Sequence, residues 1–161
     1  MMRTEGLRTT NRKERGQGLV EFALVLPIFL MLIMGIVEFG RLMFIYNSVA
    51  TASREAARYG ASVGINTAGV EHFRDCSGIR DTAQRLAGFA PIEHTNINIE
   101  YDNPATGFHE TSCPPSQFEL GDRIIVSVSI TFEPIVPLMD IPPLPVTSET
   151  KRTVLRDVYI K

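Results

Sequence analysis

Residues on which metal centres and active sites depend are scarce in this sequence of 161 residues. It contains two cysteines and three histidines, His72, His94 and His109. These histidines show no ligand spacing with the cysteines that would suggest a zinc site. Motifs for a nucleophilic serine, a phosphate-binding loop and a zinc protease are also missing. The sequence therefore predicts no metal, no cofactor and no enzymatic activity.

A general excess of basic charge is also missing, because the formal net charge is −2. Residues 1–16 are an exception, with five basic and two acidic residues and a net charge of +3. The rest of the chain has eleven basic and sixteen acidic residues, a net charge of −5. Nucleic-acid-binding domains usually carry a basic surface. We therefore expect no nucleic-acid partner and interpret the basic N-terminus through membrane topology.

A long apolar segment extends from Leu19 to Tyr46, and residues 22–37 contain no charge. About 20 apolar residues span the roughly 30 Å hydrocarbon core of a bilayer. The segment therefore predicts one transmembrane helix, assigned to residues 17–46. Since basic residues precede it and mixed charges follow, the positive-inside rule predicts a cytoplasmic N-terminus and an extracytoplasmic domain of residues 47–161.

Two other interpretations of the apolar segment remain open. A core helix of a soluble protein rarely keeps sixteen consecutive apolar positions. A secretory signal peptide would be cut near Ala50-Thr51-Ala52, but its apolar region is typically about 7 to 15 residues long. Helix-favouring residues also continue through Arg58, so we expect the helix to continue into the domain.

A glutamate lies near the start of the apolar segment, where Glu21 is the fifth residue after Gly16. A carboxylate at the bilayer centre costs about 2.5 to 3.5 kcal/mol on insertion scales, and less near the interface. Residues 16–22, GQGLVEF, resemble the leader junction of type IV prepilins, in which a peptidase cuts after a glycine. The resemblance implies that residues 1–16 are a leader and that Gln17 becomes the N-terminus.

The same resemblance implies a role for Glu21. In pilins the glutamate at the fifth mature position pairs with the N-terminal amine of a neighbouring subunit. A buried unpaired charge is unfavourable, so such a pair would penalise misregistered assembly. The alternative is that Glu21 extends to the cytoplasmic headgroups, as any glutamate close to the interface can.

Three stretches carry a more specific similarity. They are residues 16–24 (GQGLVEFAL) with Pro27, residues 35–41 (GIVEFGR) and residues 52–61 (ASREAARYGA). Together they resemble the TadE-like family of the tight adherence, or Flp pilus, secretion system. The resemblance implies a minor pilin or pseudopilin that takes part in pilus assembly and has no catalytic activity.

The family also implies partners and a location. The implied partners are the membrane, the prepilin peptidase, other pilins and pseudopilins, and the tight adherence secretion platform. The implied location is the bacterial cell membrane, as a single-pass protein that can associate with the pilus. The sequence does not separate a TadE role from a TadF or TadG role. The alternative is an unprocessed bitopic protein whose exported domain binds an envelope partner or ligand.

Two charged residues near the end of the apolar segment are also assembly candidates. Glu38 and Arg41 are three positions apart, on one helical face, so they can pair with each other or with a partner subunit. Phe22 and Glu21 complete the set of residues that we assign to assembly.

The domain after the helix is predicted to be α+β and pilin-like. A second helix is expected from about Ser77 to Ala87, followed by Gly88 as a stop. Alternating apolar residues predict strands at residues 96–101 and 123–132, and a weaker strand at residues 147–155. The proline-rich residues 134–145 cannot continue a central strand. We expect a three-stranded antiparallel sheet packed on helices.

The two cysteines, Cys76 and Cys113, both fall in the predicted extracytoplasmic domain. An even number of cysteines in an oxidising compartment indicates a disulfide. Closing a loop of this length would contribute roughly 3 to 4 kcal/mol in the chain-entropy model.

Overall fold

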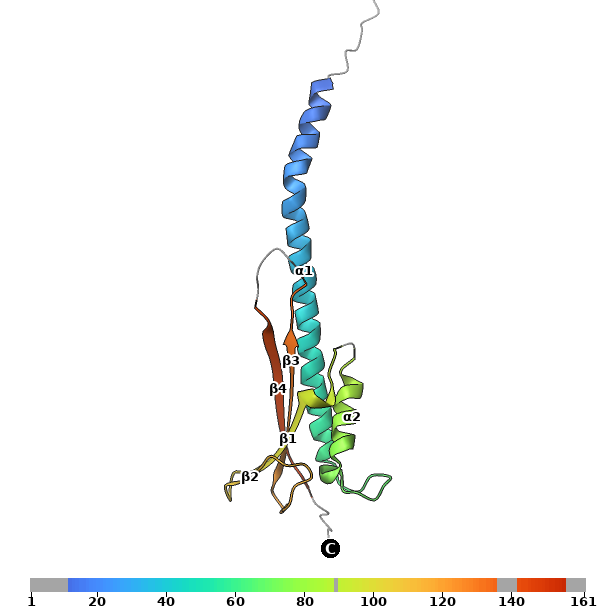
Figure 1. Cartoon of the computed structure of the whole chain (residues 1–161), viewed down its shortest axis with the longest axis vertical. Helices are drawn as coiled ribbons and strands as arrows, with labels where there is room; N and C mark the ends of the chain where they lie inside the picture. The colour runs from blue at the N-terminus through green and yellow to red at the C-terminus, as the bar shows by residue number, and fades with distance from the viewer. Residues whose placement is uncertain (1–11, 89, 136–141, 156–161) are drawn as a thin grey trace, which may run out of the picture. The chain divides into compact units, whose positions relative to one another are not determined.

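A computed structural model of the protein describes residues 12–88, 90–135 and 142–155, with the backbone alone for residues 12–15. The chain forms two compact units, an N-terminal unit up to Phe39 and a C-terminal unit from Gly40. The elements, in chain order, are α1 (Arg12–Gly60), η1 (His72–Arg74), α2 (Cys76–Leu86), η2 (His94–Asn96), β1 (Ile97–Asn103), β2 (Phe108–Glu110), β3 (Arg123–Phe132) and β4 (Leu144–Thr153) (Figure 1).

Helix α1 supplies the described part of the N-terminal unit and the first element of the C-terminal unit. It continues through Pro27 and ends at Gly60, so the expectation that the helix extends beyond the apolar segment is confirmed. In the C-terminal unit α1 buries Ile45, Val49, Ala52 and Ala56. Their spacing of four, three and four residues follows the helical period, so they form one stripe that faces the core.

The sheet of the C-terminal unit has the strand order β2-β1-β3-β4, and every pair is antiparallel. Alternate residues of β3 are buried, as the sequence pattern predicted: Ile124, Val126, Val128, Ile130 and Phe132. On β1, the buried side chains of Ile97, Ile99 and Tyr101 lie beside three of them, because these residues pair with Val128, Val126 and Ile124.

The prediction of a three-stranded sheet is wrong, because the sheet has four strands. The missed strand, β2, has only three residues, and it pairs with β1 through Tyr101, Asp102 and Asn103. Its sequence, Phe-His-Glu, offers no apolar alternation. The hairpin is fixed instead by its turn, where Asn103 accepts hydrogen bonds from Ala105 and Gly107, and Gly107 has a φ of +76°. Only glycine adopts such a conformation without strain.

Strand β4 is present where a weaker strand was expected, and the structure explains its weak pattern. Ser148 and Thr150 pair with core-facing residues of β3, so they also point toward the core. Their hydroxyl groups lie 2.9 and 3.1 Å from the hydroxyl of Ser53, which is fully buried on α1. Buried hydroxyls with such partners are tolerated. Polar residues therefore occupy core-facing positions of β4 where the alternating pattern of a strand normally has apolar residues, and this weakens the sequence signal.

Helix α2 has nearly the predicted bounds, and Asp75 fixes its start. The Asp75 carboxylate accepts hydrogen bonds from the Gly78 amide (2.9 Å) and the Ser77 hydroxyl (3.0 Å). It also accepts from the Tyr59 hydroxyl (2.7 Å) and the Asn66 side-chain amide (2.8 Å). One carboxylate therefore joins the end of α1, the following loop and the start of α2. Burial opposes its ionisation, but these hydrogen bonds outweigh burial and lower the pKa of Asp75 to about 2.

We predict that Asp75→Ala lowers the free energy of unfolding of the C-terminal unit by about 1 to 2 kcal/mol, because the helix loses its N-cap. Asp75→Asn keeps an oxygen for the Gly78 amide and should cost less. The contribution of the charge is present above the ordinary pKa of 3.8 and is lost as the pH falls toward 2. Thermal unfolding of the full chain in detergent, followed by circular dichroism from pH 7 to pH 2, measures both effects. An Asp75→Asn protein that loses as much stability in acid as the unmodified protein would contradict this assignment.

Candidate functional site

The predicted leader junction lies in the first turns of α1. The Gln17 side-chain amide donates a hydrogen bond to the Glu21 carboxylate (3.1 Å), as residues four positions apart on a helix can. The structure therefore places Gln17 and Glu21 on one face of α1. The amide satisfies one acceptor site of the carboxylate but does not neutralise its charge.

The two residues on either side of this pair are exposed. Gly16 has no atom within 4 Å of the position that a Cβ would occupy, so the described structure leaves room for a larger side chain there. Phe22 is 63% exposed. Neither residue contributes to a core within the chain, and the roles assigned to them in processing and assembly stay predictions.

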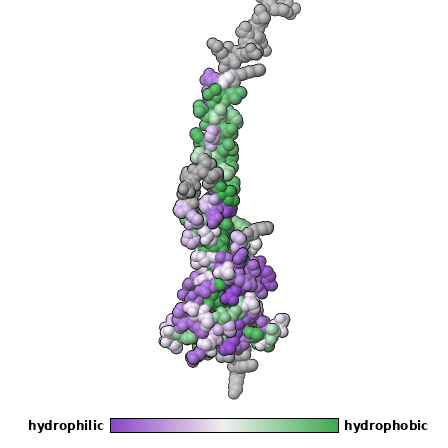
Figure 2. All heavy atoms as spheres, in the orientation of Figure 1, coloured by the Kyte–Doolittle hydropathy of each residue, from purple (hydrophilic) through white to green (hydrophobic). Residues whose placement is uncertain are grey.

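The N-terminal unit exposes a continuous apolar surface (Figure 2). From Leu19 to Phe39 its exposed large apolar residues are Leu19, Val20, Phe22, Leu24, Val25, Ile28, Phe29, Leu30, Met31, Leu32, Ile33, Met34, Ile36, Val37 and Phe39. In the described residues, α1 is the one helix long and apolar enough to cross a membrane. Since none of its most apolar stretch is buried, α1 is not the core helix of a soluble fold in that stretch.

Glu38 and Arg41 lie at the adjoining ends of the two units, and their predicted pairing stays a prediction. The structure gives Arg41 partners that the sequence did not suggest. Its guanidinium donates a hydrogen bond to the backbone carbonyl of Glu133 (2.6 Å) and lies over the ring of Phe132, 4.6 Å from the centroid. Both contacts are with the end of β3, so Arg41 holds the start of the C-terminal unit to its sheet.

Cys76 and Cys113 form a disulfide in the structure, with a Cα–Cα distance of 5.8 Å. The bond joins the first residue of α2 to the segment after β2, across 37 positions of sequence. The hydroxyl of the fully buried Tyr101 lies 3.2 Å from the Cys113 sulfur and donates to the carbonyl of Phe73 (2.5 Å). Burial raises the pKa of the Tyr101 hydroxyl.

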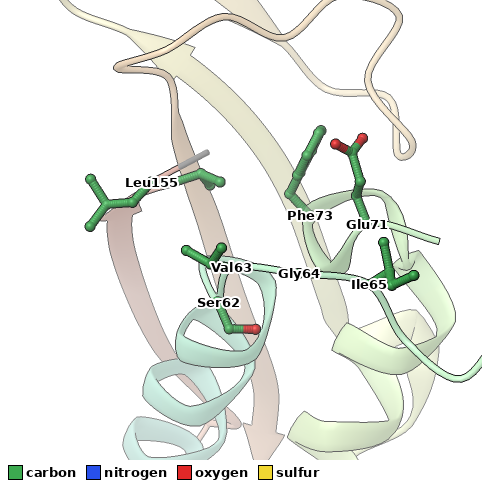
Figure 3. A pocket seen from close by; sticks show the side chains of 8 residues that line it. Ser62, Val63, Gly64, Ile65, Glu71, Phe73 and Leu155 are labelled. Carbon is green, nitrogen blue, oxygen red and sulfur yellow. The ribbon is translucent and has the colours of Figure 1, made fainter. Parts of the chain in front are cut away.

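A pocket of about 260 Å³ opens at the end of α1 and the start of the following loop (Figure 3). Its lining residues are Ser62, Val63, Gly64, Ile65, Glu71, Phe73, Val154 and Leu155. The hydroxyl of Ser62 donates to the Tyr59 carbonyl (2.6 Å), and Glu71 forms an ion pair with Arg74 (3.4 Å). Both polar side chains of the lining therefore have partners outside the pocket, Tyr59 and Arg74.

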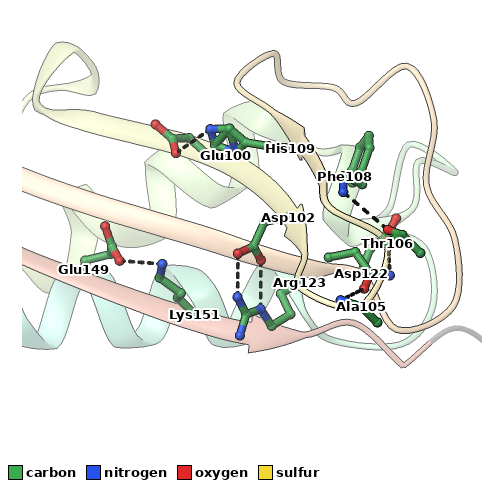
Figure 4. A network of polar contacts seen from close by, with 11 residues as sticks. Glu100, Asp102, Ala105, Thr106, Phe108, His109, Asp122, Arg123, Glu149 and Lys151 are labelled. Carbon is green, nitrogen blue, oxygen red and sulfur yellow. Dashed lines mark hydrogen bonds and ion pairs between the residues drawn. The ribbon is translucent and has the colours of Figure 1, made fainter.

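The solvated face of the sheet carries a group of ion pairs (Figure 4). Asp102 and Arg123 are paired across β1 and β3, and the Arg123 Nε lies 2.8 Å from the Asp102 carboxylate. The hydrogen bond from Arg123 lowers the pKa of Asp102. Lys151 pairs with Glu149 (3.0 Å) on β4. Asp102 and Arg123 lie on neighbouring strands, so their ion pair supports the pairing of β1 with β3.

In the residues that the structure describes, no group of three or more histidine, cysteine, aspartate or glutamate side chains could hold a metal ion.

Two residues with central contacts, Asp75 and Ser53, were not identified from the sequence. An aspartate directly before a helix is a recognised capping signal and could have revealed Asp75. No local signal identifies Ser53, because its partners on β4 are about 95 positions away.

A protein-family model described as TadE-like protein matches residues 16–58. The match covers most of α1 and none of the sheet, and it confirms the resemblance to the TadE-like family in that segment. No curated protein matches the chain. No solved structure matches it either. The matched segment contains the exposed apolar stretch of α1, which is long and apolar enough to cross a membrane.

We predict that Arg41→Met weakens the attachment of the β3 end by about 1 to 2 kcal/mol, because a charged hydrogen bond and a cation–π contact are lost. Hydrogen exchange of the amides in residues 128–132 should accelerate, while exchange in residues 101–102 of β1, which pair with the opposite end of β3, stays unchanged. Arg58→Met is the matched control, since the exposed Arg58 forms an ion pair with Glu55 (2.7 Å) on the same helix and no hydrogen bond or ion pair with the described part of the sheet. Equal exchange in the two variants would show that Arg41 does not hold the sheet.

Proposed function

We propose that this chain, which is TadE-like over residues 16–58, is a minor pilin or pseudopilin that takes part in assembly of a tight adherence (Flp-type) pilus. A prepilin peptidase processes it after Gly16. One observation supports the proposal above the others: Gln17 and Glu21 share one face at the start of an exposed apolar helix.

Processing would change the charge at this face. Cutting after Gly16 removes a leader with a net charge of +3 and creates an ammonium group on Gln17. The amide of Gln17 already meets the Glu21 carboxylate within the chain, but an amide carries no charge. In low dielectric, the carboxylate and the new ammonium each need an opposite charge. Neighbouring subunits in register would supply those charges to each other.

The proposed topology follows from the charges on either side of the apolar helix. The basic leader stays in the cytoplasm and the C-terminal unit is exported. An extracytoplasmic location agrees with the disulfide between Cys76 and Cys113, because disulfides persist in oxidising compartments. The assembly surface is assigned to Glu21 and Phe22, with Glu38 and Arg41 at the other end of the apolar segment.

The proposed partners are those that the family implies. They are the membrane, the prepilin peptidase, other pilins and pseudopilins, and the tight adherence secretion platform. We propose no catalytic activity, no cofactor and no nucleic-acid partner for the chain. The competing hypothesis is an unprocessed bitopic protein whose exported domain binds an envelope partner or ligand.

We predict that Gly16→Leu blocks processing, so that the leader remains on the membrane-bound protein. The substitution meets no steric obstacle in the folded chain, so a loss of processing reports on the peptidase and not on the fold. N-terminal sequencing of the membrane fraction, from cells that contain the peptidase, should give Gln17 for the unmodified protein and an intact leader for the variant.

Gly35→Leu is the matched control for processing, because Gly35 is a helical glycine with equally open surroundings and lies far from the junction. It should be cut as the unmodified protein is. An unmodified protein that keeps its leader would favour the unprocessed bitopic protein.

We also predict that Glu21→Gln is processed normally but enters pili poorly. Glutamine can still accept a hydrogen bond from Gln17, so the change removes only the charge. Removing one partner of a buried ion pair costs about 3 to 5 kcal/mol, so recovery of the subunit in sheared surface pili should fall by more than about tenfold.

Glu55→Gln serves as the control for loss of a carboxylate on α1, because the half-buried Glu55 pairs with the exposed Arg58 on the same helix. It should leave recovery within about twofold of the unmodified level. Normal recovery of the Glu21→Gln subunit would rule out the proposed charge pair between subunits. It would not affect the conclusion about processing after Gly16.

A further inference from the structure

The sheet reaches the start of the C-terminal unit at Arg41, and this residue is close in the chain to the apolar run. Sixteen uncharged residues, 22–37, make about 24 Å of helix, against a hydrocarbon core of about 30 Å. The remaining few ångströms must come from residues on either side of the run. Arg41 follows Val37 by four positions, which is about 6 Å of helix. Its backbone therefore lies near the edge of the hydrocarbon, where arginine side chains extend to the headgroups.

The contacts of Arg41 bring the end of β3 to the same depth. The guanidinium donates to the Glu133 carbonyl (2.6 Å) and covers the ring of Phe132. Phe132 pairs with Leu144, the first residue of β4. Figure 1 shows the end of β3 beside α1 and the start of β4 beside β3. All these residues belong to the C-terminal unit, so the argument depends on the arrangement inside that unit alone.

This end of the sheet presents apolar side chains to its surroundings. Ile135, three residues after the end of β3, is 71% exposed, and Leu144 is 41% exposed. On α1 the neighbouring residues Met43, Phe44 and Tyr46 are also large, apolar and exposed. Apolar and aromatic side chains are favoured at the boundary between headgroups and acyl chains.

We propose that the β3–β4 end of the C-terminal unit, with Ile135 and Leu144, contacts the interface of the bilayer that α1 spans. The occupant of this apolar surface is lipid, because Arg41 lies close to the end of the uncharged run and holds the end of β3 beside it. The contact would hold the unit against the membrane. It requires that α1 crosses the membrane but does not require cleavage at Gly16 or entry into a pilus.

Tryptophan fluorescence tests this proposal directly, because the chain contains no tryptophan. Three single substitutions are compared: Ile135→Trp, Leu144→Trp and Leu120→Trp. Leu120 is the matched control, since it is 69% exposed and lies in the turn before β3, at the opposite end of that strand. Phe29→Trp, in the apolar run, calibrates full exposure to lipid. Each full-length protein is reconstituted into phosphatidylcholine vesicles with and without dibrominated phosphatidylcholine.

The expected result is blue-shifted emission and quenching by the brominated lipid for Ile135→Trp and Leu144→Trp, between the values for Phe29→Trp and Leu120→Trp. Leu120→Trp should instead be quenched by aqueous iodide. Protection of Cys76 and Cys113 from alkylation without reduction verifies that each variant is folded. The proposal is overturned if Ile135→Trp and Leu144→Trp behave like Leu120→Trp, or if bromolipid quenches all three equally.

Discussion

One helix in this protein must satisfy two different surroundings with one set of backbone hydrogen bonds. Helix α1 is continuous from Arg12 to Gly60, and a helix can do this because its backbone groups bond within the segment, in lipid as in a protein core. The side chains differ between the two parts of the helix. The first part exposes large apolar residues, and the part in the C-terminal unit buries a narrow stripe that includes Ala52, Ala56 and Ala57. Small residues allow the sheet to supply the bulk of the core.

Buried polar contacts then fix the elements that pack on this helix. Ser53 meets two hydroxyls of β4, and Asp75 accepts four hydrogen bonds from three segments of the chain. Tyr101 joins β1 to the loop before α2 beside the disulfide. Hydrophobic packing alone is not directional, whereas each of these contacts is satisfied in one arrangement only. They therefore select one position for β4 and one for α2 against the α1 stripe.

Charges mark both ends of the apolar run, and they have different partners. Glu21 has the side-chain amide of Gln17, which leaves its charge to be balanced by another group. Arg41 has a backbone carbonyl and an aromatic ring of β3, which suit a cation at the edge of a bilayer. The first end is therefore suited to an intermolecular ion pair and the second to attachment of the sheet. This difference is the physical basis for proposing a charge pair between subunits at the first end and a contact of the sheet with the membrane beside the second.

The sequence by itself determined the apolar helix, its continuation into the C-terminal unit and the strand at residues 123–132, and it suggested the leader-like junction. Each of these depends on neighbours in the chain, through helical period, alternation or spacing. It also suggested the pairing of Cys76 with Cys113, because no other cysteines compete. Only the tertiary structure decided the fourth strand, the inward polar face of β4 and the partners of Arg41. β2 forms because a turn places three residues beside β1, and Arg41 meets Glu133 across 92 positions of sequence. Contacts between distant segments produce no periodic pattern in the sequence of either segment, so they can be identified only in the folded structure.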